Sequence, residues 1–72
     1  MTTEIRYRFE YPVGPYLDRG VHGGRLRKAV VARAVADSGM STTRATIARA
    51  SVRQFEAGGA VWVRVTFKEV RL

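Results

Sequence analysis

The chain has 72 residues, with 13 Lys and Arg against 6 Asp and Glu, a net charge of +7 and no cysteine. Its length leaves room for one hydrophobic core, so we expect a single domain over residues 1–72. The lack of cysteine excludes disulfides and thiolate metal sites, and the lack of a long apolar run excludes a signal peptide and a membrane span. These features predict a cytoplasmic protein.

The positive charge is concentrated in the middle of the chain. Residues 1–18 carry a net charge of −1 and residues 54–72 carry +1, whereas residues 19–53 carry +7, with Asp37 as their only acid. A field of this kind attracts polyanions, such as nucleic acid or an acidic protein face. The charge therefore predicts the class of partner before any motif is considered.

Residues 4–11 alternate between apolar and charged side chains, the pattern of a strand with one buried face. The apolar face holds Ile5, Tyr7, Phe9 and Tyr11, and the charged face holds Glu4, Arg6, Arg8 and Glu10. Pro12 and Pro15 end this strand and open a loop with the sequence PVGPYLDRGVHGG. At about a dozen residues the loop is longer than most connections in small domains.

Residues 25–38 predict a helix, because Ala, Leu, Arg and Lys dominate and Gly39 is a natural stop. Leu26, Val30 and Ala34 form its apolar stripe, with Val31 and Val35 beside it. The opposite side carries small residues flanked by cations. Residues 60–72 form a second clear strand, rich in β-branched and aromatic residues, with Val61, Val63, Val65 and Phe67 on one face.

Residues 43–57 allow two readings. As a helix, the stretch SGMSTTRATIARA resembles the helix-turn-helix proteins, which have a glycine in the turn and a Ser/Thr-capped recognition helix; Ala45 stands where that pattern has a buried Ile or Val. As a strand, the segment joins residues 60–72 through a two-residue turn at Gly58-Gly59. The hairpin would place these residues opposite one another: Phe55 and Trp62, Arg53 and Arg64, Ser51 and Thr66, Arg49 and Lys68, Gln54 and Val63, Val52 and Val65, and Ala50 and Phe67.

The hairpin is favoured, because its inner face is mostly apolar and alternates small with large residues, and because Thr43, Thr46, Ile47 and Val52 suit a strand. The expected fold is α+β, a small antiparallel sheet with one packed helix in the order β-α-β-β; the alternative is β-α-α-β with a helix-turn-helix-like pair. The predicted core is Ile5, Tyr7, Phe9, Tyr11, Leu26, Val30, Ala34, Val52, Val61, Val63, Val65 and Phe67.

This order of elements and the closing FEAGGAVWVRVTFKEVRL resemble the dodecins, small flavin-storing proteins that assemble into dodecamers. The resemblance implies a β-α-β-β topology and a homo-oligomer. Dodecins place a tryptophan near the start of the second strand to stack on flavin, whereas this chain has Ala45 or Ile47 there and its one tryptophan in the last strand. We therefore expect no flavin and no other cofactor.

The outer face of the hairpin brings cations together with two aromatic rings, which suits a nucleic acid: cations neutralise phosphates and rings stack on bases. The alternative is an ordinary surface, in which Glu4 and Glu10 of the first strand neutralise some of these cations and Phe55 and Trp62 cover a dimer contact. Glycines before the helix offer a second, weaker anion site beside Arg25, Arg27 and Lys28. The residues predicted to bind nucleic acid or an acidic partner are Arg25, Arg27, Lys28, Arg33, Arg44, Arg49, Arg53, Phe55, Trp62, Arg64 and Lys68.

We expect no enzyme, because no nucleophile and base stand in a recognisable arrangement, and no metal site, because His22 is the only histidine. The leading hypothesis is a small nucleic-acid-binding module, for DNA in the first place, with no membrane partner. Two alternatives stay open. One is a protein-interaction module, such as an anti-CRISPR-like inhibitor of phage type that docks on an acidic face of a host complex. The other is a dodecin-like homo-oligomer.

Overall fold

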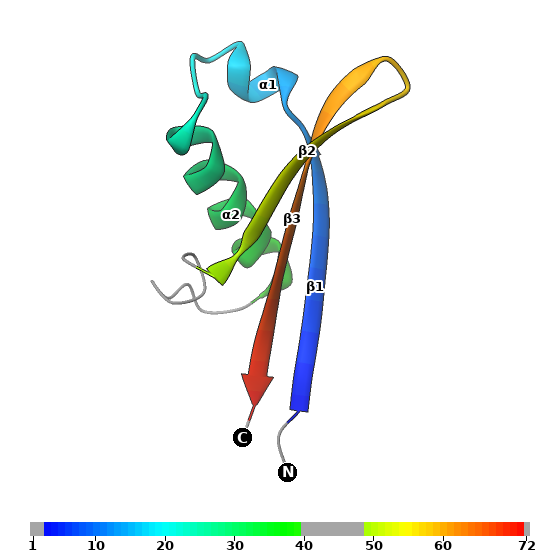
Figure 1. The fold of residues 1–72 in the computed structure, drawn as a ribbon. Helices are drawn as coiled ribbons and strands as arrows, with labels where there is room; N and C mark the ends of the chain where they lie inside the picture. Colours follow the sequence, from blue (N-terminus) through cyan, green and yellow to red (C-terminus); the bar gives the residue numbers. More distant parts are fainter. Residues whose placement is uncertain (1–2, 40–48, 72) are drawn as a thin grey trace.

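The computed structural model describes residues 3–39 and 49–71. Its elements follow the chain as β1 (Thr3–Pro12), α1 (Gly14–Leu17), α2 (Gly24–Ser38), β2 (Ser51–Ala57) and β3 (Ala60–Arg71). The strands form an antiparallel sheet in the order β1-β3-β2, and α2 covers one face of it (Figure 1). The predicted α+β class and the β-α-β-β order of the main elements are confirmed.

The hairpin has the predicted register. Ser51, Arg53 and Phe55 of β2 lie opposite Thr66, Arg64 and Trp62 of β3. Gly58 and Gly59 both have positive φ, 59° and 76°, the combination that a two-residue hairpin turn of type I′ requires. The helical alternative for residues 43–57 is therefore wrong for residues 51–57.

The hairpin is shorter at its open end than predicted. β2 begins at Ser51, and Arg49 is helical, so the expected pairs of Arg49 with Lys68 and of Ala50 with Phe67 are not part of the ladder. Residues 43–48 lie outside the described residues, and with them Ala45, Ile47 and the predicted site residue Arg44.

The core lies between α2 and the inner face of the sheet. Its buried residues are Val13, Leu26, Val30, Val31, Ala34, Val35, Ala50, Val63, Val65 and Phe67. Tyr7, Phe9, Tyr11 and Val52 are only partly buried against this cluster, because they lie on the outer strands, whereas α2 covers the central strand β3 more completely. Val31 and Val35, expected beside the main stripe, are fully buried.

Two core assignments from the sequence are wrong. Val61 is 40% exposed, because the hairpin end of β3 extends beyond the cover of α2 (Figure 1). Ile5, near the other end of the sheet, is half-buried and lies outside the core cluster. Val13, which was not predicted to be buried, is 2% exposed and donates its backbone N–H to Val61 O at 3.0 Å.

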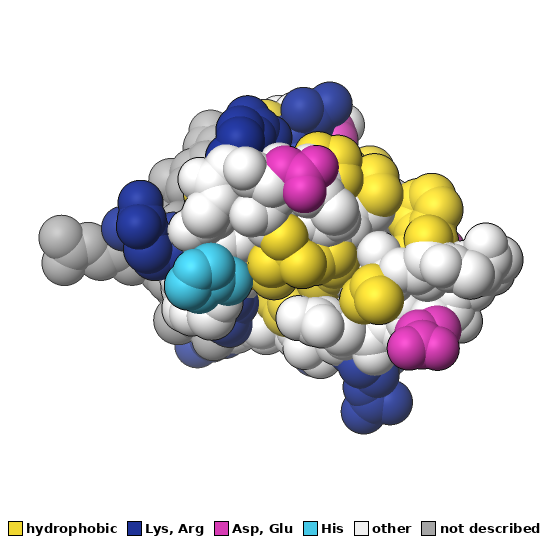
Figure 2. Space-filling model, turned by 90° about the horizontal axis from the view of Figure 1, so that it is seen from above, with side chains coloured by type: hydrophobic (Ala, Val, Ile, Leu, Met, Phe, Trp, Pro, Cys, Tyr) yellow, Lys and Arg dark blue, Asp and Glu magenta, His cyan; other side chains and the backbone are white. Residues whose placement is uncertain are grey.

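The segment expected to be a plain loop contains the short helix α1. Pro15 suits its first turn, where a backbone N–H is not needed, and Leu17 and Asp18 donate their N–H groups to Val13 O and Gly14 O. At this end of the molecule hydrophobic side chains lie in the centre and Lys and Arg at the margins (Figure 2), and the exposed large hydrophobic residues of the described chain are Leu17 and Val61. Neither described helix has the length and hydrophobicity needed to cross a membrane.

Candidate nucleic-acid interface

The sheet has a second face, turned away from α2, which we call the outer face. Its side chains are Glu4, Arg6, Arg8, Glu10, Ser51, Arg53, Phe55, Trp62, Arg64, Thr66 and Lys68. Five of these residues are cations and two are carboxylates. Among the described residues no element covers this face, so the charges stand on an open surface.

The pairing register arranges these side chains in rows across the strands. Trp62 and Phe55 form the row nearest the hairpin turn, and the next row contains Glu10, Arg64 and Arg53. Successive rows are about 6.8 Å apart, because side chains on one face are separated by two residues of strand. The outer face therefore presents an aromatic pair followed by regularly spaced polar and charged side chains.

The aromatic row is held in place by polar contacts. The guanidinium of Arg64 lies over the Phe55 ring, 4.8 Å from its centroid, and Trp62 Nε1 donates a hydrogen bond to Ala57 O at 3.3 Å. Both rings are half-buried rather than fully exposed. A flat group could therefore stack on the Arg64–Phe55 pair or on the remaining surface of Trp62.

The carboxylates of β1 neutralise part of the cationic surface, which is the alternative that the sequence left open to a binding role for these cations. Glu10 Oε2 lies 3.1 Å from Arg64 Nη2, and Glu4 lies 3.0 Å from Arg6 Nε and 3.9 Å from Lys68 Nζ. The hydrogen bond from Arg6 and the charge of Lys68 hold the pKa of Glu4 below its ordinary value. All of these pairs are partly exposed, so each contributes little to stability.

Arg53 and Arg8 remain without a counter-ion among the described residues. Arg53 lies directly opposite Arg64 on β3, and Arg8 lies opposite Thr66. Like charges that face each other across a sheet destabilise it. The positive charge of Arg53 therefore does not stabilise the fold.

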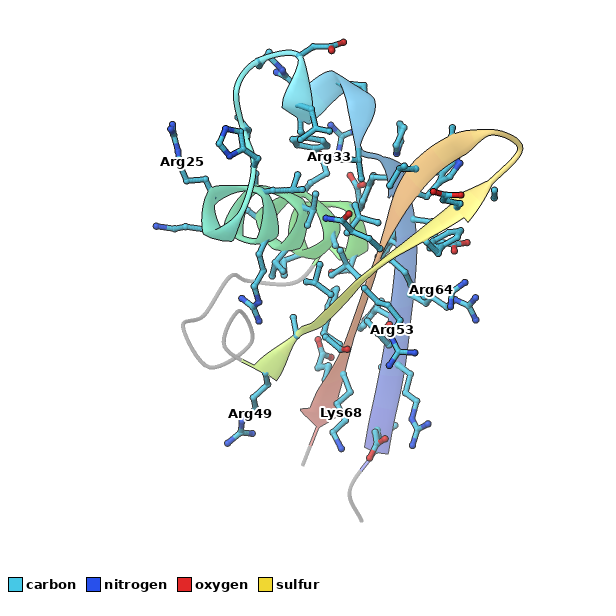
Figure 3. The ribbon with its side chains drawn as sticks, turned by 45° about the horizontal axis from the view of Figure 1, so that its top comes forward. Arg25, Arg33, Arg49, Arg53, Arg64 and Lys68 are labelled. Atoms are coloured by element: carbon cyan, nitrogen blue, oxygen red, sulfur yellow. The ribbon has the colours of Figure 1, made fainter. Side chains whose placement is uncertain are left out.

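The cations predicted on the helix occupy a separate surface. Arg25 and Arg33 project from α2, whereas Arg53, Arg64 and Lys68 project from the sheet (Figure 3). Lys28 is also exposed on α2. Since α2 packs with its apolar stripe on the inner face, its exposed side and the outer face point in opposite directions. The cations of the outer face and those at the start of α2, predicted as a main and a second site, thus lie on two separate surfaces.

Two of the helix cations are held by other parts of the chain. Arg27 is turned toward β2 and donates from Nη2 to Ala50 O at 2.8 Å, so it is no free anion ligand at the start of the helix. Arg33 Nε donates to both carboxylate oxygens of Asp37 at 3.2 Å. Hydrogen bonds from the Tyr11 hydroxyl and from Arg33 lower the pKa of Asp37.

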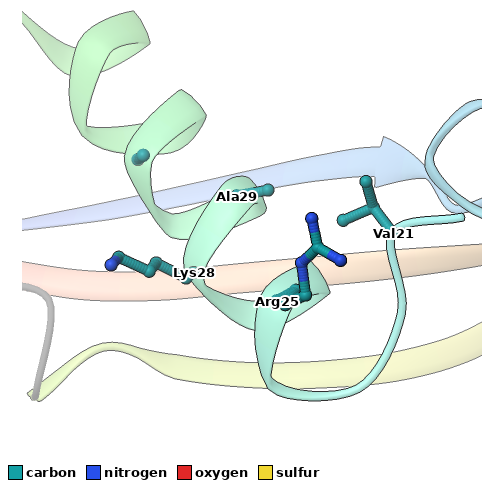
Figure 4. Close-up of a pocket in the computed structure, with 5 residues that line it drawn as sticks. Val21, Arg25, Lys28 and Ala29 are labelled. Atoms are coloured by element: carbon teal, nitrogen blue, oxygen red, sulfur yellow. The ribbon is translucent and has the colours of Figure 1, made fainter. Parts of the chain in front are cut away.

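Arg25 and Lys28 flank a shallow depression of about 430 Å³ on α2, which Val21, Ala29 and Ala32 complete (Figure 4). Neither cation has a counter-ion among the described residues. His22, at the edge of the preceding loop, is exposed. In the described part of the chain no three His, Asp or Glu side chains gather in a way that could hold a metal ion.

The sequence prediction did not include Arg6 and Arg8 in the site, although their alternation with Glu4 and Glu10 had placed them on the charged face of β1. The sequence did not show which strand of the hairpin pairs with β1. Once β1 lies beside β3, both arginines join the outer face of the hairpin. Arg49, predicted on this face, is exposed but precedes β2.

No protein-family model, curated protein sequence or solved structure matches this chain. The function must therefore be argued from the geometry of these two surfaces.

Proposed function

We propose that the protein is a nucleic-acid-binding module that holds a single strand along the outer face of its sheet. The observation that carries the proposal is the unpaired Arg53 set directly opposite Arg64. This arrangement costs stability in the free protein, and a phosphate placed between the two guanidinium groups removes the repulsion.

The shape of the face favours a single strand over a duplex. The outer face carries no protruding helix to enter a major groove, and its rows are separated by about 6.8 Å, a step that suits an extended backbone. The rings of Phe55 and Trp62 at one end can stack on unpaired bases, which a duplex keeps inside its own stack. Contacts of this kind read charge and base planes, so we expect weak sequence preference.

The test compares two double variants with equal charge. Arg53→Gln/Lys68→Gln alters the outer face, and Arg25→Gln/Lys28→Gln alters the exposed side of α2; each lowers the net charge of +7 by two. Trp62 fluorescence is followed during titration with single- and double-stranded DNA and RNA at several salt concentrations. The outer-face variant should lose about 1.4 from the slope of log K against log salt for a single strand, because two phosphate contacts disappear.

The helix variant should keep the wild-type slope. Equal losses in both variants would mean that only the overall field attracts the polyanion, and the assignment to the outer face would fail. If no oligonucleotide binds at low salt, nucleic acid is excluded as the partner. The alternative is then that the basic face binds an acidic surface of another protein.

A further inference from the structure

The strand β1 leaves one long edge of the sheet open. It is ten residues long and pairs with β3 on one side; in the described part of the chain nothing pairs with its other side. An edge of this length offers a row of unsatisfied backbone groups to another strand. The question is which strand would fit it.

The direction of these backbone groups follows from one hydrogen bond. Val13 N–H donates to Val61 O, so residues of odd number on β1 direct their N–H and C=O groups toward β3. By alternation, the groups of Glu4, Arg6, Arg8 and Glu10 point to the open edge. Pro12, which has no N–H, stands at one of these outward positions, where proline removes no bond from the sheet.

We propose that the open edge of β1 pairs antiparallel with β1 of a second copy of this chain, about a two-fold axis at Phe9. In this register Arg8 of each copy lies opposite Glu10 of the other, and their outward N–H and C=O groups form the new ladder. Arg8, which has no counter-ion within the described chain, gains Glu10 of the other copy, a carboxylate that also binds Arg64 of its own chain at 3.1 Å. On the inner face, Phe9 meets Phe9 of the second copy, and Tyr7 meets Tyr11.

The charge pattern selects this register over its neighbours. An axis at Tyr7 sets Glu4 against Glu10 and Arg6 against Arg8, all like charges. An axis at Arg6 sets Arg6 against itself, although it also sets Glu4 opposite Arg8. An axis at Arg8 sets Arg8 against itself, although it also sets Arg6 opposite Glu10. An axis at Ile5 pairs Glu4 with Arg6 and leaves Arg8 without an acidic residue opposite it. Like charges directly opposite are destabilising, so the axis at Phe9 is favoured.

The inner face supplies the apolar part of the contact. Tyr7, Phe9 and Tyr11 are half-buried, and they already form a stacked row with Phe67: the ring centroids of Tyr7 and Phe67 are 5.2 Å apart, and those of Phe9 and Tyr11 are 6.4 Å apart. A second copy extends this row across the axis, where side chains of a non-hydrogen-bonded pair come closest. The product is one continuous sheet with both α2 helices on the same face.

This inference does not depend on nucleic-acid binding, and its test is mass in solution. Sedimentation equilibrium of the wild type should show a concentration-dependent rise from 8.0 kDa toward twice that mass. Arg8→Glu turns two attractive pairs into two repulsive ones and should weaken the dimer about tenfold or more. Glu10→Arg should do the same, and Arg8→Glu/Glu10→Arg should restore the dimer, since each new glutamate again faces an arginine.

Arg53→Glu, a reversal of the same kind on the far strand, is the matched control and should leave the mass unchanged. Phe9→Cys gives an independent readout of the axis: the chain has no other cysteine, and oxidation should cross-link two copies through position 9, whereas Ile5→Cys should not cross-link. A mass of 8.0 kDa at all concentrations, or an unchanged dimer in Arg8→Glu, overturns the proposal. A folded but monomeric double variant overturns the register.

Discussion

Replacing Arg53 with glutamine should stabilise the fold and weaken nucleic-acid binding at the same time. Arg53 faces Arg64 across the hairpin and has no counter-ion among the described residues. A directly opposed like-charge pair costs about 0.2–1 kcal/mol. Because Glu10 lies 3.1 Å from Arg64 and both arginines reach solvent, we expect a gain near the lower end, about 0.3 kcal/mol, or about 1–2 °C in Tm.

The binding loss should appear in the salt dependence. One lost phosphate contact lowers the slope of log K against log salt by about 0.7 for a single strand. Between about 50 and 200 mM salt, the fold-loss of affinity should therefore be about 2.5 times smaller for the variant than for the wild type.

Thermal unfolding at low salt and in about 1 M salt separates charge from strand propensity. Screening at the higher concentration removes the charge effect, so the gain in Tm should vanish there. A gain that persists in high salt would come from propensity alone. If Arg53→Gln lowered the Tm at low salt, the claim that Arg53 destabilises the fold would be refuted. If the slope of log K against log salt were unchanged, Arg53 would not belong to the binding site.

Three further predictions concern the fold. Val65→Ala removes buried methyl groups from the centre of β3, where Val65 is 0% exposed, and should cost about 2–3 kcal/mol in urea unfolding; a cost below half of this would place the core elsewhere. Gly39→Ala should cost about 1 kcal/mol, because Gly39 ends α2 with φ 77°; circular dichroism during thermal unfolding tests this, and an unchanged Tm would contradict the left-handed cap. The pKa of Asp37 is lowered by the Tyr11 hydroxyl and Arg33, so its contribution to stability is present above about pH 3.9 and lost as the pH falls through the lowered pKa; urea unfolding of Asp37→Asn should therefore vary less with pH in this range than that of the wild type.

Local patterns in the sequence were enough to predict the secondary structure of most of the fold. Alternation identified β1 and β3, and the pairing argument across Gly58-Gly59 gave the register of β2, because a two-residue turn leaves one way to align the arms. The exposure of Val61 and the burial of Val13 could not be found in this way. Both depend on how much of the sheet α2 covers, which is a property of the tertiary structure.

The sequence predicted the positions of some residues of the outer face, but not the extent of that surface. The rows of the hairpin placed Arg53, Arg64, Phe55 and Trp62 together correctly. Nothing in the sequence showed that Arg27 would turn to the carbonyl of Ala50, because that contact joins the start of α2 to a residue far along the chain. A long side chain such as that of arginine can either form a contact within the protein or bind a ligand. Which of the two it does depends on the tertiary structure.

The position of β3 in the middle of the sheet also determines when the domain can fold. Every strand pair includes β3, yet β3 is synthesised after all the other described elements. While it is still inside the ribosome, β1 and β2 have no partner strand and α2 has no central surface on which to bury Val30 and Val35. Because Thr3 pairs with Arg71, β1 must wait for almost the whole described chain before its ladder is complete. Folding of these elements should therefore wait for β3 and be governed by contacts between residues far apart in the sequence.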